Sequence, residues 1–333
     1  MGIMVKRHLS IRLILASLTA GLVLPVLSKH GTATGEAVQT ITLAASSGAA
    51  DWPALLQSRD PALQDALRAR LTKMGLAREA KRGKLAVALV DITDPTNPRM
   101  AAINAHRAMY AASLPKIAIL LGAFQKHADG HMELTPAHES HLTSMIRRSS
   151  NTSATYMLET VGFDYLHQVL ESDRYKLYDP SLNGGLWVGK AYAKKGAWKR
   201  DPINNLSHAA TVFEVARFYY LLETGRLVSD ESSLKMKTML ADPAIKHKFV
   251  LGLSSHRPDA RIYRKSGTWR TYHADSAVVE RDGRRYIAVA LADSPTGGAW
   301  LSKLIVAMDD LVFSPENVAK DRTQQLAQGA SSR

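Results

Sequence analysis

Residues 113–124 have the sequence SLPKIAILLGAF, and this stretch decides how the rest of the chain is interpreted. Ser113 and Lys116 stand three positions apart at its start, and an apolar run follows before Gly130. The run predicts a buried helix over residues 117–124, closed by that glycine. Residues three apart share one face of a helix, so we expect the lysine amine to reach the serine hydroxyl. Burial and the positive end of the helix dipole disfavour a charged lysine, which suits Lys116 to act as a base.

A Ser-x-x-Lys pattern is weak on its own, because so short a motif recurs by chance in a chain of this size. Ser232 and Lys235 repeat it, but they stand in a polar stretch with no apolar helix behind them. The context therefore favours Ser113 as the nucleophile.

A second motif, Ser149-Ser150-Asn151, interrupts a stretch that otherwise has helical character. Consecutive serines followed by asparagine indicate a loop entering a helix, so a simple N-cap is one interpretation. The functional alternative makes Ser149 a proton relay to a leaving group and Asn151 a donor to a substrate amide.

A third motif, Lys265-Ser266-Gly267-Thr268, ends a strand predicted over residues 260–265. Glycine lets a ligand approach the backbone, the lysine supplies a positive charge, and a strand edge offers amides. A strand that ends in a turn is the alternative. The order of the motifs favours the functional interpretation, because this is the only Lys-Ser/Thr-Gly match in the chain and it follows the other two motifs.

These three motifs in this order resemble the class A β-lactamases and the related DD-peptidases, over residues 51–313. The resemblance implies that Ser113 is acylated, that Lys116 assists as base, and that Ser149 protonates the leaving nitrogen. It also implies the groups that bind the substrate: Asn151 for its amide, Lys265 and Ser266 for its carboxylate, and the N–H groups of Ser113 and Thr268, next to Gly267, as the oxyanion hole. It implies no cofactor and no metal.

The resemblance further implies an α/β (α+β) fold of the β-lactamase/transpeptidase type, with an antiparallel sheet flanked by helices, a small helical subdomain and the site between them. Local patterns agree with it: strands are predicted over 85–90, 100–104, 260–265, 276–280 and 286–291, and helices over 61–76, 117–124, 211–222 and 300–313. Residues 281–284 predict a turn, and Thr211 with Glu214 predicts a capping box. Strands at both ends of the chain predict a sheet whose edge strands come from the N-terminal part.

Two departures from the class A pattern matter. Only 36 positions separate Ser113 from Ser149, so we expect a trimmed helical part and a more open cleft. The class A loop Glu-Pro-x-Leu-Asn is replaced by Asp179-Pro180-Ser181-Leu182-Asn183.

Asp179 is therefore the implied activator of the deacylating water, and Asn183 an implied substrate-binding residue. Aspartate is one methylene shorter than glutamate, and a misplacement of about 1 Å can cost on the order of a hundredfold, so poor deacylation is expected. A simple proline-containing turn is the equal alternative, and it predicts slow turnover like that of a penicillin-binding protein. Gly184, Gly185 and Trp187 are expected near the rim of the cleft.

The two ends of the chain differ in composition from its middle. Lys6, Arg7 and Arg12 precede or border an apolar run over residues 13–27, which predicts a secretory signal, with an uncleaved anchor as the alternative. The sequence predicts the following division: signal 1–28, flexible lead-in 29–50, hydrolase domain 51–315 and disordered tail 316–333. Export to the periplasm or the extracellular space is expected.

Composition excludes several classes of function. The chain has no cysteine, which rules out thiol catalysis, disulfides and a lipid-modified cysteine. Its net charge of +13 lies in short clusters, which predict a solvated surface or attraction to an anionic cell envelope. The expected partner is a small-molecule β-lactam or a peptidoglycan-like peptide, with no nucleic acid and no stable protein partner.

Other interpretations remain open. His127, His131, His138 and His141 lie close in sequence, but their spacing and polar surroundings favour solvated histidines over a metal site. His273 and Asp275 share a strand face and would suit a Ser-His-Asp triad, although no Gly-x-Ser-x-Gly elbow is present. A non-catalytic envelope-binding protein of the same fold is a further alternative. The motifs do not separate a β-lactamase from a DD-peptidase or a related amide or ester hydrolase.

Overall fold

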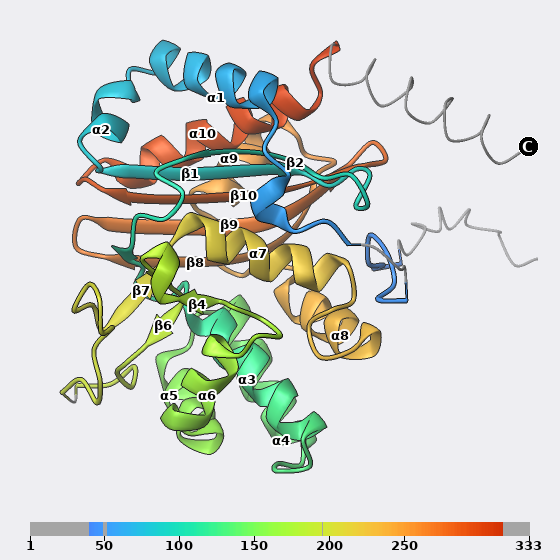
Figure 1. The fold of residues 1–333 in the computed structure, drawn as a ribbon, viewed down its shortest axis with the longest axis vertical. Coiled ribbons are helices and arrows are strands. Elements are labelled where there is room, and N and C mark those ends of the chain that lie inside the picture. The colour runs from blue at the N-terminus through green and yellow to red at the C-terminus, as the bar shows by residue number, and fades with distance from the viewer. Residues whose placement is uncertain (1–39, 49–51, 195, 316–333) are drawn as a thin grey trace, which may run out of the picture. The chain divides into compact units, whose positions relative to one another are not determined.

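A five-stranded antiparallel sheet forms the centre of the computed structural model, which describes residues 40–48, 52–194 and 196–315 (Figure 1). Its strands lie in the order β2 (Arg99–Ile103), β1 (Leu85–Asp91), β10 (Arg284–Asp293), β9 (Tyr272–Arg281) and β8 (Arg261–Trp269). The prediction of N-terminal edge strands is right for β2 and wrong for the other edge. That edge is β8, because β1 pairs with β10 in the middle of the sheet.

The hairpin between β9 and β10 fixes the register of the sheet. Asp282 and Gly283 both have positive φ angles, 46° and 74°, and Arg281 pairs directly with Arg284. A two-residue loop with this geometry matches the twist of antiparallel strands, and an Asp-Gly pair adopts it readily. The predicted turn is therefore confirmed.

Helices cover both faces of the sheet, as Figure 1 shows. Leu85, Val87 and Leu89 of β1 belong to one buried cluster with residues of α1 (Pro61–Lys73) and α10 (Gly297–Val312). The alternate residues of β1, beginning with Ala86, face a second cluster that includes α7 (Val212–Glu223). The remaining helices near the sheet are α2 (Ala77–Lys81), α8 (Asp230–Leu240) and α9 (Phe249–His256), with the short η1 (Leu55–Gln57) before α1.

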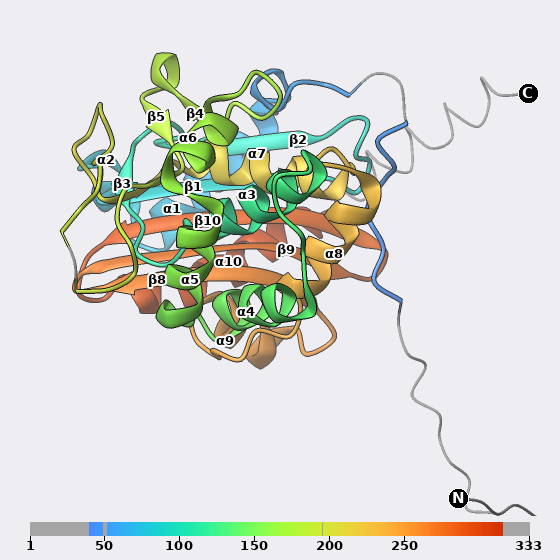
Figure 2. The same ribbon diagram turned by 90° about the horizontal axis from the view of Figure 1, so that it is seen from below.

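A group of helices packs on the α7 side of the sheet, and Figure 2 shows it in front of the strands. It consists of α3 (Lys116–Ala128), α4 (Pro136–Arg147), α5 (Asn151–Val161) and α6 (Phe163–Glu171), which contact one another. This group is the predicted small helical subdomain. The α/β fold and its antiparallel sheet are confirmed.

Two small sheets connect the helices to the main sheet. β3 (Met109–Tyr110), β7 (His208–Ala210) and β6 (Trp187–Val188) form one of them. β4 (Tyr178–Asp179) and β5 (Gly184–Gly185) form the other, with the 3-10 turn η2 (Pro180–Leu182) between them. Patterns in the sequence did not predict these strands, because two or three residues carry no measurable alternation.

The predicted signal, most of the lead-in and the predicted tail lie outside the described residues. Within the described part of the chain, no helix is both long enough and apolar enough to span a membrane.

Candidate functional site

The predicted nucleophile lies in a tight turn between β3 and α3. Ala112 has a positive φ of 50°, and Leu114 N–H donates to Ala111 O at 3.0 Å. Helix α3 begins only at Lys116, so Ser113 sits in the turn that leads into the helix and not within it. Ser113 is half-buried, and its backbone N–H makes no hydrogen bond to any described group.

Gly267 of β8 is pressed against this turn. A Cβ at that position would lie 2.1 Å from Ala111 O and 2.7 Å from Ser113 N. Only glycine allows the strand to approach so closely. The motif Lys265–Thr268 is thus inside β8 and not at its end, which corrects the shorter strand predicted from the sequence.

Lys116 is fully buried beside the start of α5. Its Nζ donates to Ser149 O at 2.7 Å, to Asn151 Oδ1 at 2.8 Å and to Ser150 O at 3.3 Å. Burial lowers the pKa of Lys116 to about 7. A large neutral fraction of the amine therefore exists near neutral pH, as a base requires.

The Ser149 hydroxyl lies between two buried lysines. Lys265 Nζ donates to Ser149 Oγ at 3.0 Å, and Lys116 Nζ lies 3.5 Å from the same oxygen. Burial first, and the charge of Lys116 second, hold the pKa of Lys265 well below its usual value. The three motifs, which are far apart in sequence, meet at this hydroxyl.

Ser149 itself has a positive φ of 56°, at the break between α4 and α5. The next residue, Ser150, caps α5 by accepting a hydrogen bond from Ser153 N–H at 3.1 Å. The N-cap interpretation of this motif is therefore correct for Ser150. Ser149 and Asn151, on either side of the cap, contact Lys116.

Lys248, just before α9, is a buried residue that the sequence did not single out. Its Nζ donates to Gly267 O at 2.6 Å, to Thr268 Oγ1 at 2.8 Å and to Ala274 O at 3.1 Å. Burial lowers the pKa of Lys248 to about 8. This lysine supports the β8 segment that faces Ser113, and no local pattern in the sequence indicates that role.

The alternative triad is not assembled. Asp275 is fully buried and accepts hydrogen bonds from Arg264 Nε and Nη2, each at 2.7 Å. His273 Nδ1 has no hydrogen-bond partner among the described residues, so the two side chains do not form the pair that a triad needs.

Asp179 is the N-cap of its own turn. Its carboxylate accepts hydrogen bonds from Ser181 N–H at 2.8 Å and Ser181 Oγ at 2.6 Å, and the hydroxyl bond lowers the pKa of Asp179. Asn183 donates instead to His106 O at 2.8 Å. The proline-containing turn is thus formed, and among the described residues neither side chain makes a hydrogen bond to Ser113, Lys116 or Lys265.

The four clustered histidines lie on helices or beside them, which corrects the expected polar loop. His138 and His141 are within α4; His138 completes a capping box with Thr135, and His141 Nδ1 lies 3.2 Å from Ser153 Oγ. His127 Nδ1 lies 3.0 Å from Met132 O. In the described part of the chain, no group of three His, Cys, Asp or Glu residues is arranged to hold a metal ion.

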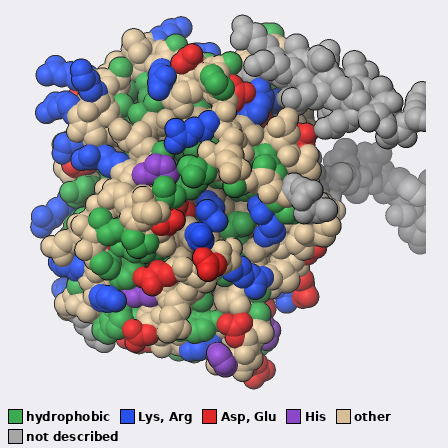
Figure 3. All heavy atoms as spheres, viewed as in Figure 1, with side chains coloured by type: hydrophobic (Ala, Val, Ile, Leu, Met, Phe, Trp, Pro, Cys, Tyr) green, Lys and Arg blue, Asp and Glu red, His purple; other side chains and the backbone are tan. Residues whose placement is uncertain are grey.

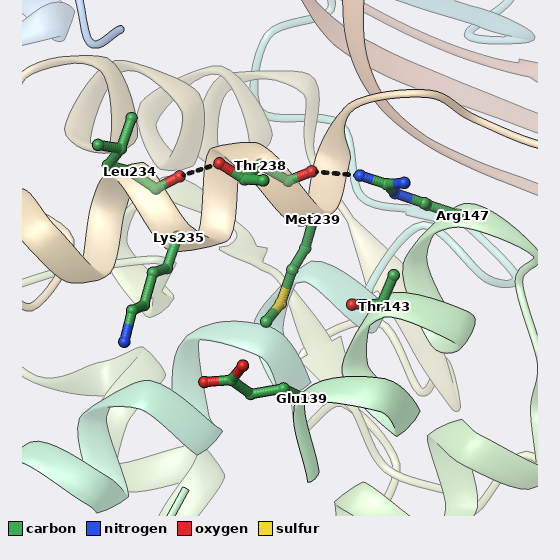
Figure 4. Close-up of a pocket in the computed structure, with 7 residues that line it drawn as sticks. All are labelled: Glu139, Thr143, Arg147, Leu234, Lys235, Thr238 and Met239. Atoms are coloured by element: carbon green, nitrogen blue, oxygen red, sulfur yellow. Dashed lines mark hydrogen bonds between the residues drawn. The ribbon is translucent and has the colours of Figure 1, made fainter. Parts of the chain in front are cut away.

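The second Ser-x-x-Lys pair lies elsewhere, on α8. Lys235 is half exposed and pairs with Glu231 at 3.4 Å. It lines a groove of about 350 Å³ between α4 and α8, where Figure 4 shows it opposite Glu139. Arg147 from α4 spans the other end of that groove by donating to Thr238 O at 2.8 Å. Within the described part of the chain, no hydrogen bond or ion pair links this pair to the three motifs.

An aromatic cluster borders the site, and sequence reasoning missed it. The ring of Tyr192 lies 4.5 Å from Lys116 Nζ and 4.5 Å from the ring of His208. Tyr110 packs edge-on against Tyr272 at 5.4 Å, next to the turn that joins β8 to β9. Tyr192 comes from the loop between β6 and β7, whose course no short pattern predicts.

Positive charge dominates part of the surface. Figure 3 shows Lys and Arg side chains along the left side of the molecule in this view, where Figure 1 places α2 and the loop between β6 and β7. Among the described residues, the exposed cations of α2, its C-cap and the loop are Arg78, Lys81, Arg82, Lys194, Lys199 and Arg200.

This arrangement has the parts that acyl transfer needs. The turn that carries Ser113 leads directly into α3 and Lys116, whose pKa is lowered, but no hydrogen bond joins the Ser113 hydroxyl to the Lys116 amine among the described residues, so the contact expected from the sequence is not formed here. The Ser149 hydroxyl links Lys116 to Lys265, and the Ser113 N–H, with no hydrogen bond to a described group, is available to an oxyanion.

Solved structures of known proteins resemble the fold of this chain. Among solved structures, a β-lactamase from Sphaerobacter thermophilus is 17% identical, with a TM-score of 0.56 over 74% of this chain and 94% of that one. A class A β-lactamase from Bacteroides cellulosilyticus is 16% identical, with a TM-score of 0.57 over 77% and 99%. An acyl-enzyme complex of a PBP-A variant with penicillin G is 16% identical, with a TM-score of 0.56 over 79% and 98%.

At these identities the likeness establishes the fold alone. A search of curated protein sequences gave no match. The family model described as the beta-lactamase enzyme family matches residues 65–312, which include all three motifs. With its nucleophile turn, paired lysines and sheet in the arrangement described above, the chain belongs to the beta-lactamase enzyme family.

Proposed function

We propose that the protein is an exported serine hydrolase that opens a β-lactam amide through an acyl-enzyme on Ser113. The observation that carries the proposal is the Ser149 hydroxyl, which lies 3.0 Å from Lys265 Nζ and 3.5 Å from Lys116 Nζ. One hydroxyl in contact with both amines provides a route for a proton from the base to a leaving group.

In the proposed reaction, neutral Lys116 takes the proton of the Ser113 hydroxyl as Oγ bonds to the carbonyl carbon of the substrate. The N–H groups of Ser113 and Thr268 receive the oxyanion. When the carbon–nitrogen bond breaks, Ser149 gives its proton to the nitrogen and regains one from protonated Lys116. Water then hydrolyses the ester and restores free Ser113.

The substrate of this proposal carries a carboxylate. Lys265 and Ser266 lie on the strand beside Ser113, and Lys248 and Arg264 add positive charge from behind that strand. Asp275 is the carboxylate in contact with this group, and Arg264 already binds it. An anionic ligand would therefore be attracted to the site.

The contacts of Asp179 favour a second candidate, a DD-peptidase or penicillin-binding protein. Its carboxylate is engaged by Ser181 and not by Lys116 or Ser113. A site with no carboxylate on the deacylating water acylates but turns over slowly. In this candidate the natural substrate is a peptidoglycan-like peptide, which agrees with the proposed export and with attraction of the basic surface to an anionic envelope.

The test mixes the purified mature protein with a chromogenic cephalosporin and, in parallel, follows its intact mass with excess penicillin. Sustained colour without a lasting adduct supports the β-lactamase, and a stable adduct without turnover supports the penicillin-binding candidate. Because neutral Lys116 is the base, we expect the acylation rate to rise with pH through about 7 and then level off.

Ser113→Ala and Lys116→Ala should each abolish acylation, while Ser232→Ala provides a matched control in the other Ser-x-x-Lys pair. An adduct that persists in Ser113→Ala, or an unaffected rate in Lys116→Ala, would overturn the assignment. Absence of both colour and adduct in the wild-type protein would leave a hydrolase of other amides or esters, or the non-catalytic binding protein.

A further inference from the structure

Lys116 has an unusual set of neighbours for a buried amine. Its polar contacts are the backbone oxygens of Ser149 and Ser150, the Asn151 side chain and the Ser149 hydroxyl. It forms no ion pair with a carboxylate of any described residue. The hydrogen bonds that stabilise its charged form therefore all come from neutral groups.

The ring of Tyr192 lies against Lys116. Lys116 Nζ is 4.5 Å from the ring centroid, which places the amine over the aromatic face. A cation in that position is attracted by the negative face of the ring. The interaction is strongest where water is excluded, as it is around this fully buried lysine.

The position of Tyr192 is fixed by its own loop. The preceding residue, Ala191, is buried, and the ring of His208 packs against Tyr192 with the centroids 4.5 Å apart. His208 Nε2 in turn donates to Lys190 O at 3.1 Å. These contacts tie the first residues of the loop to β7.

The same side chain reaches the nucleophile turn. Tyr192 O–H donates to Ala112 O at 3.4 Å, and Ala112 is the residue with positive φ that precedes Ser113. The ring of Tyr192 thus contacts Lys116, and its hydroxyl contacts the residue before Ser113.

We propose that Tyr192 is a positioning residue of the active site, whose ring covers the Lys116 amine and whose hydroxyl supports the turn that carries Ser113. The inference rests on the proposed role of Lys116 as the base. It assigns control of the Lys116 amine to the loop between β6 and β7.

Other titratable groups also face Lys116. Lys265 approaches from β8 through the shared Ser149 hydroxyl, and His208 lies behind Tyr192 on β7. Burial lowers the pKa of His208 to about 4, so its ring is neutral at pH 7. Tyr110 is near the Tyr192 hydroxyl, and burial holds the pKa of both tyrosines above the usual value. A charge on Lys265 would oppose a charge on Lys116, whereas the Tyr192 ring adds to the support that the Ser149 and Asn151 oxygens give it.

The test compares Tyr192→Phe with Tyr192→Leu. Phenylalanine keeps the aromatic face, whereas leucine keeps an apolar side chain over the amine and loses the face. We expect the midpoint of the acylation rate against pH to stay at the wild-type value in Tyr192→Phe. In Tyr192→Leu we expect it to fall by roughly half to one pH unit, because the ammonium form loses its aromatic partner.

Tyr156→Leu is the matched control, since Tyr156 is an exposed tyrosine on α5 whose ring packs at a tilt against His141 and has no cation–π contact with Lys116. If Tyr192→Leu does not fold, Tyr192→Met makes the same comparison. A wild-type midpoint in the folded leucine or methionine variant, or equal shifts in Phe and Leu, would overturn the proposal.

A second measurement keeps this proposal separate from the proposed function. The Lys116 signal in protein labelled with ¹³C at lysine Cε, assigned with Lys116→Arg, titrates without any substrate. We expect the same fall in Tyr192→Leu and no change in Tyr192→Phe. If penicillin fails to acylate the wild-type protein, the proposed function fails and this titration still decides the role of Tyr192.

Discussion

At the scale of single residues, Gly267 sets the distance between β8 and the turn that carries Ser113. A built Cβ would lie 2.1 Å from Ala111 O, which is backbone and unable to rotate away. In Gly267→Ala, either β8 or the turn carrying Ser113 has to move. Because a misplacement of about 1 Å can cost on the order of a hundredfold, we expect acylation to fall by about that factor.

Overpacking of this kind should also lower the free energy of unfolding by roughly 1–3 kcal/mol. Urea unfolding and the rate of adduct formation with penicillin measure the two effects. Gly196→Ala is the control, because nothing lies within 4 Å of a Cβ at that position. Acylation at the wild-type rate in Gly267→Ala would show that the contact with Ala111 O does not position Ser113.

The residues that could be predicted from the sequence are those with a fixed identity at a fixed spacing. Ser113 and Lys116 form a motif of this kind, and so do Ser149 with Asn151 and Lys265 with its neighbours. Tyr192 and Lys248 could not be found, because their closeness to the site depends on the course of a long loop and on the turn before α9. No periodic pattern marks either position.

At the scale of elements, the break between α4 and α5 positions two residues of the site, Ser149 and Asn151. Ser150 caps α5 by accepting from Ser153 N–H at 3.1 Å, and Ser149 and Asn151 flank it. Ser150→Ala should lower the free energy of unfolding by about 1 kcal/mol, as loss of an N-cap typically does. We also expect slower acylation, because fraying of the first turn displaces the groups around Lys116.

Ser229→Ala is a matched control for this prediction. Ser229 caps α8 in the same way, by accepting from Ser232 N–H at 3.1 Å, and has no contact with the site. The two variants should unfold at similar urea concentrations, and only Ser150→Ala should acylate more slowly. Equal acylation rates in both would mean that the cap serves stability alone.

The central elements could be predicted because their patterns are long. Residues 85–90 and 286–291 lie inside β1 and β10, and the 281–284 turn is formed. The prediction for β8 stopped at Lys265 because Ser, Gly and Thr suggest a turn, whereas pairing with β9 extends the strand to Trp269. Thr211 caps α7 as predicted, but the reciprocal bond from Glu214 is not made, since both its carboxylate oxygens lack partners among the described residues.

At the scale of the whole molecule, the fold joins parts of the site that lie far apart in the chain. Lys265 and Ser149 are separated by 116 positions and share a hydrogen bond across the boundary between sheet and helical part. The order of the motifs predicted which residues would meet. It did not predict their distances, because those depend on packing on both faces of the sheet.

Glu214 makes the stability of the whole molecule depend on pH. It is fully buried in α7, and burial raises its pKa to about 8, an effect that Arg217 opposes and Asp179 reinforces. The folded protein therefore holds a proton there that the unfolded chain releases above its ordinary pKa of 4.5. The contribution of Glu214 to stability is complete below that pH and is lost as the pH rises toward 8.

We expect Glu214→Gln to remove this dependence, since a neutral amide replaces a neutral acid. At pH 5 the variant and the wild type should unfold at similar urea concentrations. At pH 8 the variant should be the more stable, with the difference growing by on the order of 1 kcal/mol per pH unit between these values. The buried lysines titrate in the opposite direction, but they are common to both proteins and cancel in the difference.

Glu231→Gln, in an exposed pair with Lys235, is the control and should show no such trend. A difference between Glu214→Gln and wild type that stays constant from pH 5 to 8 would mean that Glu214 does not hold a proton in the folded protein.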